Sequence, residues 1–239
     1  MRRKSWQLLV LAAFFPVLPV ILLADPVLTQ VDTFQSGPEG WHIGGPMFPV
    51  TPLPTVNGGG PGGAGDDYLL LASTGNPGPG GRLVGINEDQ WSGNYFTNGV
   101  NAITMDLKNL GSTDLFIRLL LAAPPFGMFG PENIVITDGV ALTAMSDWTR
   151  HTFSISPSDV IVLAGTANAT LANAFELRIF HNPDPDFPGP PTGIPRISAQ
   201  LGVDNIAAAA IPEPATTLLL ASGFAALAMK LRKRGGRVH

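Results

Sequence analysis

The stretch Ala102-Ile103-Thr104-Met105-Asp106-Leu107-Lys108 alternates apolar and polar side chains. Successive side chains of an extended strand point to opposite faces, so Ile103, Met105 and Leu107 can face a core while their polar neighbours face water. The segment Phe175-Glu176-Leu177-Arg178-Ile179-Phe180 alternates in the same way. Both stretches predict half-buried β-strands.

Similar short segments recur along the chain, separated by turns rich in glycine and proline. They cover residues 28–34, 68–73, 82–86, 102–107, 115–122, 134–142, 148–155, 175–180 and 200–206. Short strands without a long helical pattern predict an all-β fold, an antiparallel β-sandwich of the jelly-roll type. Only brief helical turns are expected, at 156–159 and 169–174.

Glycine and proline are concentrated in two stretches, residues 36–67 and 182–195. Each is predicted to be a long surface connection, either functional or a disordered insertion. Trp41 and Trp148 adjoin predicted strands and are expected in the core.

The N-terminal residues 1–24 have the pattern of a secretory signal peptide. Basic residues at 2–4 precede a long apolar stretch that ends at Ala24, a small residue suited to cleavage. The length of the apolar stretch leaves an uncleaved anchor as the alternative, although Pro16 and Pro19 disfavour a continuous membrane helix.

The C-terminal segment combines an uncharged apolar stretch with a basic end. Residues 215–229 carry no charge and predict a short transmembrane helix, near the lower limit of about 17 residues when its flanks are included. The basic tail 230–239 is expected to stop transfer and hold that end in the cytoplasm, mainly through Lys230, Arg232, Lys233 and Arg234. An ordinary tail anchor and a buried core helix are the alternatives; the absence of a polar face separate from the apolar one argues against the buried helix.

The motif Pro212-Glu213-Pro214, the apolar stretch and the basic end resemble the PEP-CTERM sorting signal of Gram-negative, exopolysaccharide-producing bacteria. The resemblance implies translocation by the Sec machinery, transient anchoring in the inner membrane through 215–229 and processing by an exosortase near residues 212–214. The protein would then reach the cell surface or the extracellular matrix. On this interpretation residues 25–210 form the folded domain and residues 211–239 the sorting signal.

The folded domain is strongly acidic once both end segments are set apart. All eighteen acidic residues lie between Asp25 and Pro214, against six basic ones, which gives a formal charge of −12. This balance argues against binding to nucleic acid. The chain contains no cysteine, so an exported protein must be held by its core or by a metal rather than by disulfides.

The domain also resembles the galactose-binding-like jelly rolls of carbohydrate-binding modules. The resemblance rests on the opening sequence Val31-Asp32-Thr33-Phe34-Gln35, on Gly40-Trp41 and on the closing Val203-Asp204-Asn205-Ile206. It implies a structural calcium ion held by Asp32, Gln35 and Asp204. The alternative is that both aspartates are exposed turn residues; the pair Asp66-Asp67 is either a second cation site or a solvated loop.

Glycan binding would require exposed aromatic rings flanked by amides. Trp91, Asn94 and Tyr95 are the candidates, and the alternative is that both rings close the end of the core. Arg118 and Arg178 occupy central strand positions. They could line a groove together with His181 and Asn182, or pair with acids on the same strand faces.

Catalysis is not expected from the motifs present. The histidines lack metal-ligand spacing, and no activated nucleophile or phosphate-binding loop appears. The carboxylates Glu88, Glu132 and Glu176 are the candidates for glycosidase chemistry. The sequence therefore favours an exported, non-catalytic glycan or matrix interaction module; a matrix protein without a specific ligand and a polysaccharide-active enzyme are the alternatives.

Overall fold

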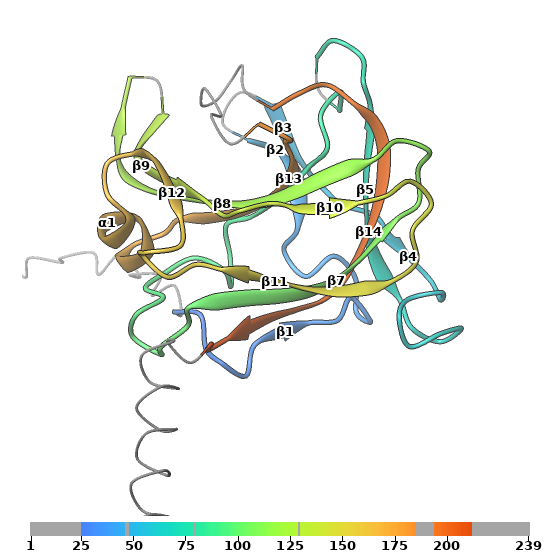
Figure 1. Ribbon diagram of the computed structural model, residues 1–239, viewed down its shortest axis with the longest axis horizontal. Helices are drawn as coiled ribbons and strands as arrows, with labels where there is room; N and C mark the ends of the chain where they lie inside the picture. Colours follow the sequence, from blue (N-terminus) through green and yellow to red (C-terminus); the bar gives the residue numbers. More distant parts are fainter. Residues whose placement is uncertain (1–24, 46–47, 79, 129, 185–193, 212–239) are drawn as a thin grey trace, which may run out of the picture.

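The computed structural model describes residues 25–45, 48–78, 80–128, 130–184 and 194–211, and these fold into two stacked antiparallel β-sheets (Figure 1). The predicted all-β sandwich is therefore confirmed. The expected signal peptide 1–24, the expected helix 215–229 and the basic tail lie outside the described residues. Within the described ranges, no helix is long and apolar enough to cross a membrane.

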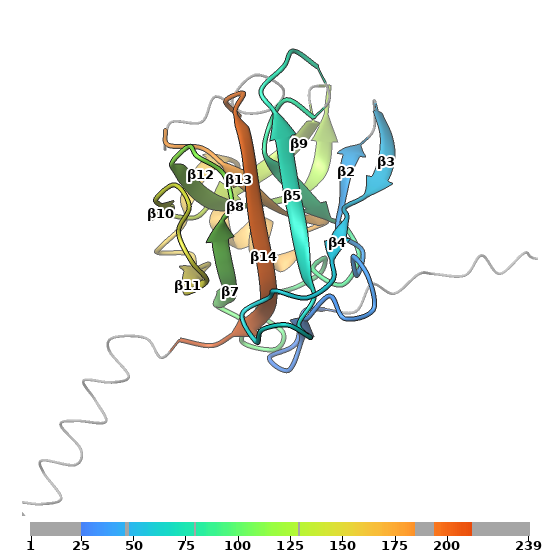
Figure 2. The ribbon, with the colours of Figure 1, turned by 90° about the vertical axis from the view of Figure 1, so that its right-hand side faces the viewer.

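The first sheet has six strands in the order β11, β7, β14, β5 and β4, with β1 paired to β14. The bounds are β1 (Val31–Asp32), β4 (Thr55–Val56), β5 (Tyr68–Thr74), β7 (Ala102–Asn109), β11 (Thr149–Ser154) and β14 (Ser198–Ala209). The long strand β14 runs through the middle of this sheet (Figure 2). It places Val203 opposite Leu69 on one side and Leu107 on the other, so that all three face the core.

The second sheet has eight strands in the order β12, β9, β8, β13, β6, β2 and β3, with β10 paired to β8. The bounds are β2 (His42–Gly45), β3 (Phe48–Pro52), β6 (Val84–Asn87), β8 (Leu115–Gly127), β9 (Gly130–Ile136), β10 (Val140–Leu142), β12 (Ile161–Ala164) and β13 (Glu176–His181). Strand β13 places Arg178 between Leu120 of β8 and Ile86 of β6. The inner residues of β13, Leu177 and Ile179, are fully buried.

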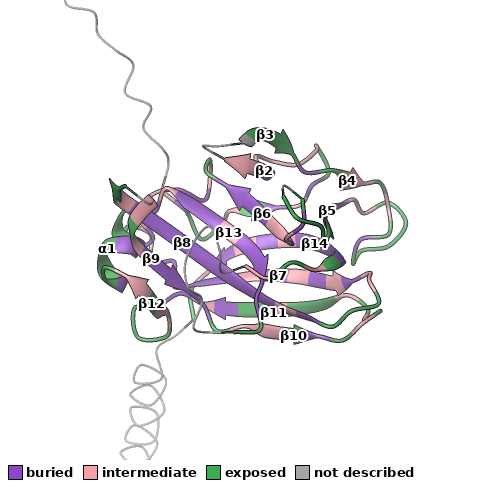
Figure 3. Cartoon of the chain, turned by 90° about the horizontal axis from the view of Figure 1, so that it is seen from above, coloured by how far each residue is buried: buried purple, intermediate pink, exposed green. Residues whose placement is uncertain are grey.

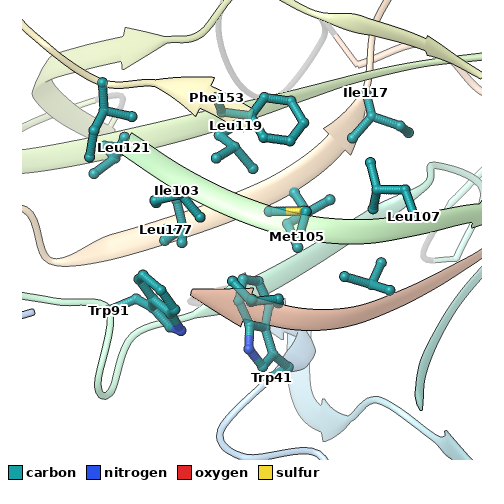
Figure 4. Close-up of a cluster of buried hydrophobic side chains, with 14 of the residues drawn as sticks. Trp41, Trp91, Ile103, Met105, Leu107, Ile117, Leu119, Leu121, Phe153 and Leu177 are labelled. Carbon is teal, nitrogen blue, oxygen red and sulfur yellow. The ribbon is translucent and has the colours of Figure 1, made fainter. Parts of the chain in front are cut away.

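The core lies between the sheets and follows the predicted alternation. Ile103, Met105 and Leu107 are fully buried, and Figure 4 shows them among side chains from the other sheet, including Leu177. Packing of two inner faces in this way is the main favourable contribution to the stability of a sandwich.

A smaller apolar cluster covers part of the outer face of the second sheet. Its buried members are Leu120, Ala122, Ile134, Ile136 and Phe180, and partly buried residues of β12 pack on them. This cluster explains why Phe180, on the polar side of an alternating strand, is buried. Figure 3, which looks onto this sheet, shows β8 and β13 largely buried.

The predicted long connection over residues 36–67 is partly wrong, because β2, β3 and β4 lie within it. These strands are short, and β3 contains Pro49 and Pro52, which remove backbone donors. Such a strand fits at the edge of a sheet, where β3 is found. Residues 57–67 do form a connection without a strand.

The predicted helical turns differ in outcome. Residues 156–159 form a turn rather than a helix. The other turn is present as α1 (Ala167–Ala172), shifted by two residues from the prediction. Thr166 starts it, because its hydroxyl accepts a hydrogen bond from the amide of Ala169 at 3.1 Å.

The two tryptophans expected in the core have different positions. Trp41 is fully buried, as predicted, whereas Trp148 is half-buried on the outer face of the first sheet. Its ring meets Tyr68 edge-on, with centroids 5.2 Å apart, and its Nε1 donates to the carbonyl of Gly59 at 2.9 Å. The ring lies directly over Gly202, where a Cβ atom would come within 2.8 Å of it.

Candidate functional site

The structure corrects the predicted aromatic platform at Trp91, Asn94 and Tyr95. Both rings are fully buried, so neither presents a face to a ligand. The hydroxyl of Tyr95 donates to the carbonyl of Trp91 at 2.7 Å, and burial raises the pKa of this phenol above its usual range. Asn94 accepts a hydrogen bond from the amide of Phe96 and shapes a turn. The alternative that these rings close the end of the core is confirmed.

Asp32 anchors the two buried tryptophans beneath this end of the core. Its Oδ2 accepts hydrogen bonds from Nε1 of Trp41 at 2.8 Å, from Nε1 of Trp91 at 2.7 Å and from Nε2 of Gln90 at 3.0 Å. Figure 4 shows the two indoles in the core. Burial raises the pKa of Asp32, and the hydrogen bonds from Trp91, Trp41 and Gln90 oppose that rise. These three N–H donors occupy Oδ2 of Asp32, and the calcium role predicted for this residue stays a prediction.

Asp204 has a different environment from Asp32. Its Oδ1 accepts from the amide of Asn205 at 2.7 Å, and it lies near the carboxylates of Asp66 and Asp106. Burial, together with these two charges, raises the pKa of Asp204 to about 7, although the Asn205 amide opposes the rise. Gln35 reaches the same place, with its Nε2 3.1 Å from Oδ1 of Asp66.

A calcium ion at Asp32, Gln35 and Asp204 stays a prediction. Among the residues that the structure describes, no group of three or more His, Cys, Asp or Glu side chains is arranged to hold a metal. If calcium binds, EGTA at pH 8 is expected to lower the melting temperature, because the neighbouring carboxylates would then repel one another. An Asp204→Asn variant should lose this response, and an unchanged melting temperature of the wild type would contradict the prediction.

A cluster of four polar side chains lies on the outer face of the second sheet. Glu176 and Arg178 extend outward from β13, because Leu177 and Ile179 take its inner face. His42 of β2 stands opposite Ile86, which is itself opposite Arg178. Since directly paired residues share a face, His42 belongs to the same side. Glu88 directly follows Asn87, the last residue of β6, which is paired with the inward-facing Leu177. The next position therefore lies on the outer side. We call His42, Glu88, Glu176 and Arg178 the outer-face cluster.

The contacts within the outer-face cluster are ionic. Nη2 of Arg178 lies 2.8 Å from Oε1 of Glu176, and Nε2 of His42 lies 3.8 Å from Oε2 of Glu88. The side chain of Glu176 is only 1% exposed, whereas those of Arg178 and Glu88 are 21% and 42% exposed. The cluster therefore reaches solvent through Arg178 and Glu88.

Four polar atoms of the outer-face cluster are buried without a hydrogen-bond partner. They are Nδ1 of His42, Nε of Arg178 and both carboxylate oxygens of Glu176. Nη2 of Arg178 nevertheless forms an ion pair with Oε1 of Glu176 at 2.8 Å, so this oxygen has a charged partner. Buried polar groups are nearly always hydrogen-bonded, and an unmet one costs about 1–3 kcal/mol.

The electrostatics of Glu176 follow from the same packing. Burial raises its pKa, Arg178 opposes the rise most strongly, and Glu88 adds to it while His42 lowers it. A carboxyl group in this setting can accept a hydrogen bond when ionised and donate one when protonated.

Two other residues predicted to line a groove serve the fold instead. Arg118 shares the outer face, but its Nε donates to the carbonyl of Asn182 at 3.0 Å and its Nη1 to that of Thr137 at 2.9 Å. Nδ1 of His181 accepts the amide of Phe116 at 2.9 Å. The carboxylate Glu132 lies apart, exposed near the turn between β8 and β9. Of the residues proposed from sequence for ligand contact or catalysis, Arg178, Glu176 and Glu88 lie in the outer-face cluster.

The fold and the cluster define an all-β sandwich module with a polar site on one sheet. Residues 210–234 match the family described as the PEP-CTERM protein-sorting motif. The chain therefore carries this motif directly after β14. The motif marks an exported protein that is processed by an exosortase at the membrane.

Several solved structures are similar to the described domain. The solution structure of CtCBM11 is 15% identical, covers 77% of this chain and 95% of its own, and has a TM-score of 0.47. A family 30 carbohydrate-binding module of a Clostridium thermocellum cellulosomal cellulase is 13% identical, with coverages of 76% and 97% and a TM-score of 0.44.

An exo-beta-agarase is also similar, at 10% identity and a TM-score of 0.47, and the match covers 67% of this chain but 22% of the enzyme. No curated protein matches the chain. Identities this low assign no ligand to this chain.

Proposed function

We propose that the described domain is a non-catalytic module that binds a neutral polysaccharide outside the cell through the outer-face cluster. The observation that carries this proposal is the group of buried polar atoms on His42, Arg178 and Glu176 that make no further hydrogen bond in the domain beyond the ion pair of Arg178 with Glu176. This set contains a donor, two acceptors and an imidazole nitrogen that can be either.

A sugar hydroxyl suits this mixture better than a simple ion. A hydroxyl group both donates and accepts, so adjacent hydroxyls can donate to Glu176 while accepting from Arg178. An anion would meet two carboxylates, and a simple cation would meet Arg178. A carbohydrate would therefore satisfy the unmet atoms without adding a charge to a buried place.

The charge of the domain favours a neutral polymer. With a formal charge of −12 between Asp25 and Pro214, the domain would repel acidic polysaccharides at low salt. After removal of the sorting signal, we place the protein at the cell surface or in the extracellular matrix of an exopolysaccharide-producing Gram-negative bacterium.

The test replaces the buried ion pair rather than breaking it. A Glu176→Met, Arg178→Met double variant is expected to keep its fold, because exchanging a buried ion pair for apolar side chains is often neutral or stabilising. Binding to the neutral polysaccharide of the source strain, measured by affinity electrophoresis, should weaken by tenfold or more, about the 1.4 kcal/mol of one lost polar contact.

The matched control removes the ion pair between Lys108 and Asp147, which are 3.1 Å apart on the first sheet. A Lys108→Met, Asp147→Asn variant should bind as the wild type does. Equal binding by both double variants would place the ligand elsewhere. No retention of the wild type would leave a matrix protein without a specific ligand as the better description.

Hydrolysis is the second candidate function, because Glu88 and Glu176 belong to one cluster and burial raises the pKa of Glu176. A glycosidase uses two carboxyl groups in different environments. The incubations used for binding can also be assayed for reducing ends. Their release by the wild type, abolished by Glu88→Gln and by Glu176→Gln, would establish an enzyme; their absence supports binding alone.

A further inference from the structure

Three segments meet at the edge of the domain from which the sorting motif continues. They are residues 25–31, 93–101 and 207–211, which we call the tail-side edge. Figure 1 shows β1 and the end of β14 along this edge. Nδ2 of Asn98 donates to the carbonyl of Pro26 at 3.0 Å, and Asn101 exchanges hydrogen bonds with the backbone of Ile211 at 2.6 and 2.8 Å. These contacts fix the three segments as one surface.

This edge collects exposed apolar side chains. Of the ten large apolar side chains that are exposed in the described residues, five belong to it, each 40–48% exposed. They are Val27, Leu28, Val31, Phe96 and Ile211. Single exposed apolar residues are common, whereas a gathering of them marks an interaction surface.

The same edge carries almost no charged side chains. Asp25 is the one charged residue in its three segments, and its Oδ1 accepts the amide of Asn94 at 2.8 Å. The rest of the domain carries a large excess of carboxylates. An anionic bilayer would therefore repel the other faces more strongly than this one.

Chain length places this edge close to the membrane during processing. Pro212, Glu213 and Pro214 alone separate Ile211 from the apolar run that starts at Ala215. Four peptide steps reach at most about 14 Å, even when fully extended. The edge cannot move farther than this from the point where the run enters the bilayer.

We propose that the tail-side edge docks the unprocessed protein on the lipid surface, with Leu28 and Phe96 entering the interfacial region. The proposal rests on processing at the membrane, which the sorting motif indicates, and does not depend on glycan binding. Apolar side chains that enter the headgroup region stabilise peripheral contact, and here the tail already supplies the first attachment. Docking would hold the Pro-Glu-Pro motif at a set height above the bilayer.

The test uses the absence of cysteine from the chain. Full-length protein is inserted into vesicles of phosphatidylethanolamine, phosphatidylglycerol and a nitroxide-labelled phosphatidylcholine. A fluorophore is attached to a single cysteine introduced as Leu28→Cys or Phe96→Cys. The controls are Val50→Cys and Met145→Cys, which replace exposed apolar residues outside the edge. Quenching at 28 and 96 should exceed that at 50 and 145 by about threefold, because only labels at the lipid surface meet the nitroxide.

A second comparison keeps the label at one position and changes the surface instead. In a Leu28→Asp, Phe96→Asp variant labelled at Val31→Cys, quenching should fall to the level of the controls, whereas a Val50→Asp, Met145→Asp variant should leave it unchanged. Equal quenching at all sites would overturn the proposal. Quenching that appears only after exosortase is added would also overturn it and identify a protein partner instead. Neither outcome bears on polysaccharide binding, which is measured without vesicles.

Discussion

Replacing Asp32 with alanine is expected to lower the free energy of unfolding by about 3–5 kcal/mol, because three N–H groups lose one shared acceptor. The indoles of Trp41 and Trp91 are fully buried, so their Nε1 atoms find no water in exchange. Gln90, which is only half-buried, can turn toward solvent. The loss therefore comes mainly from the two tryptophans.

The measurement is urea unfolding of the mature domain, followed by tryptophan fluorescence and circular dichroism. Asp138→Ala is the control, because Asp138 is exposed and should change stability by no more than about 0.5 kcal/mol. Asp32→Asn keeps an oxygen acceptor and should lie between the two. If Asp32→Ala and Asp138→Ala unfold at the same urea concentration, Asp32 is not the anchor of the tryptophans.

Asp204 is expected to make the domain less stable as the pH rises from about 4 to about 7. Its pKa is raised from 3.8 to about 7, so in this window the folded state binds a proton that the unfolded state has released. The contribution of Asp204 to stability is therefore fully present below the unfolded pKa and is lost as the pH rises through the folded pKa. At about 1.4 kcal/mol per pKa unit, the decline is roughly 3–4 kcal/mol.

An Asp204→Asn variant should remove most of this decline, because an amide resembles the protonated carboxyl. Thermal melts at pH 4, 5.5 and 7.5 would show it as a flatter pH profile. Asp147→Asn is the control: the amide of Trp148 and the charge of Lys108 lower the pKa of exposed Asp147 below its ordinary 3.8, so its contribution changes only under more acidic conditions and the profile from pH 4 to 7.5 should stay that of the wild type. Parallel profiles for wild type and Asp204→Asn would show that Asp204 does not titrate in this range.

Strand β7 shows how far periodicity carries the prediction of this fold. Ile103, Met105 and Leu107 differ clearly from their neighbours, and both faces of the strand are as expected. Strands β2 and β3 were missed because glycines and prolines conceal any alternation in them. The pairing of β2 with β6 depends on a long-range contact rather than on local preference.

The candidate site was less accessible to sequence reasoning than the fold. Alternation along β13 correctly puts Glu176 and Arg178 on one face. His42 and Glu88 reach them from segments far apart in the sequence, and register alone decides that meeting. The sequence left Trp91 and Tyr95 open between a glycan platform and the end of the core, because a turn rich in polar residues gives no sign of which rings fold inward.

The position of β14 in the first sheet links folding to the order of export. This strand joins β1, β5 and β7, so each of these has an unpaired edge until residues 198–209 are in place. The sorting motif begins at residue 210, directly behind it. During secretion the polypeptide emerges with this strand last, and the sheet closes only when the sorting signal itself reaches the membrane. The last strand of the first sheet and the sorting motif are therefore neighbours along the chain and in the order of export.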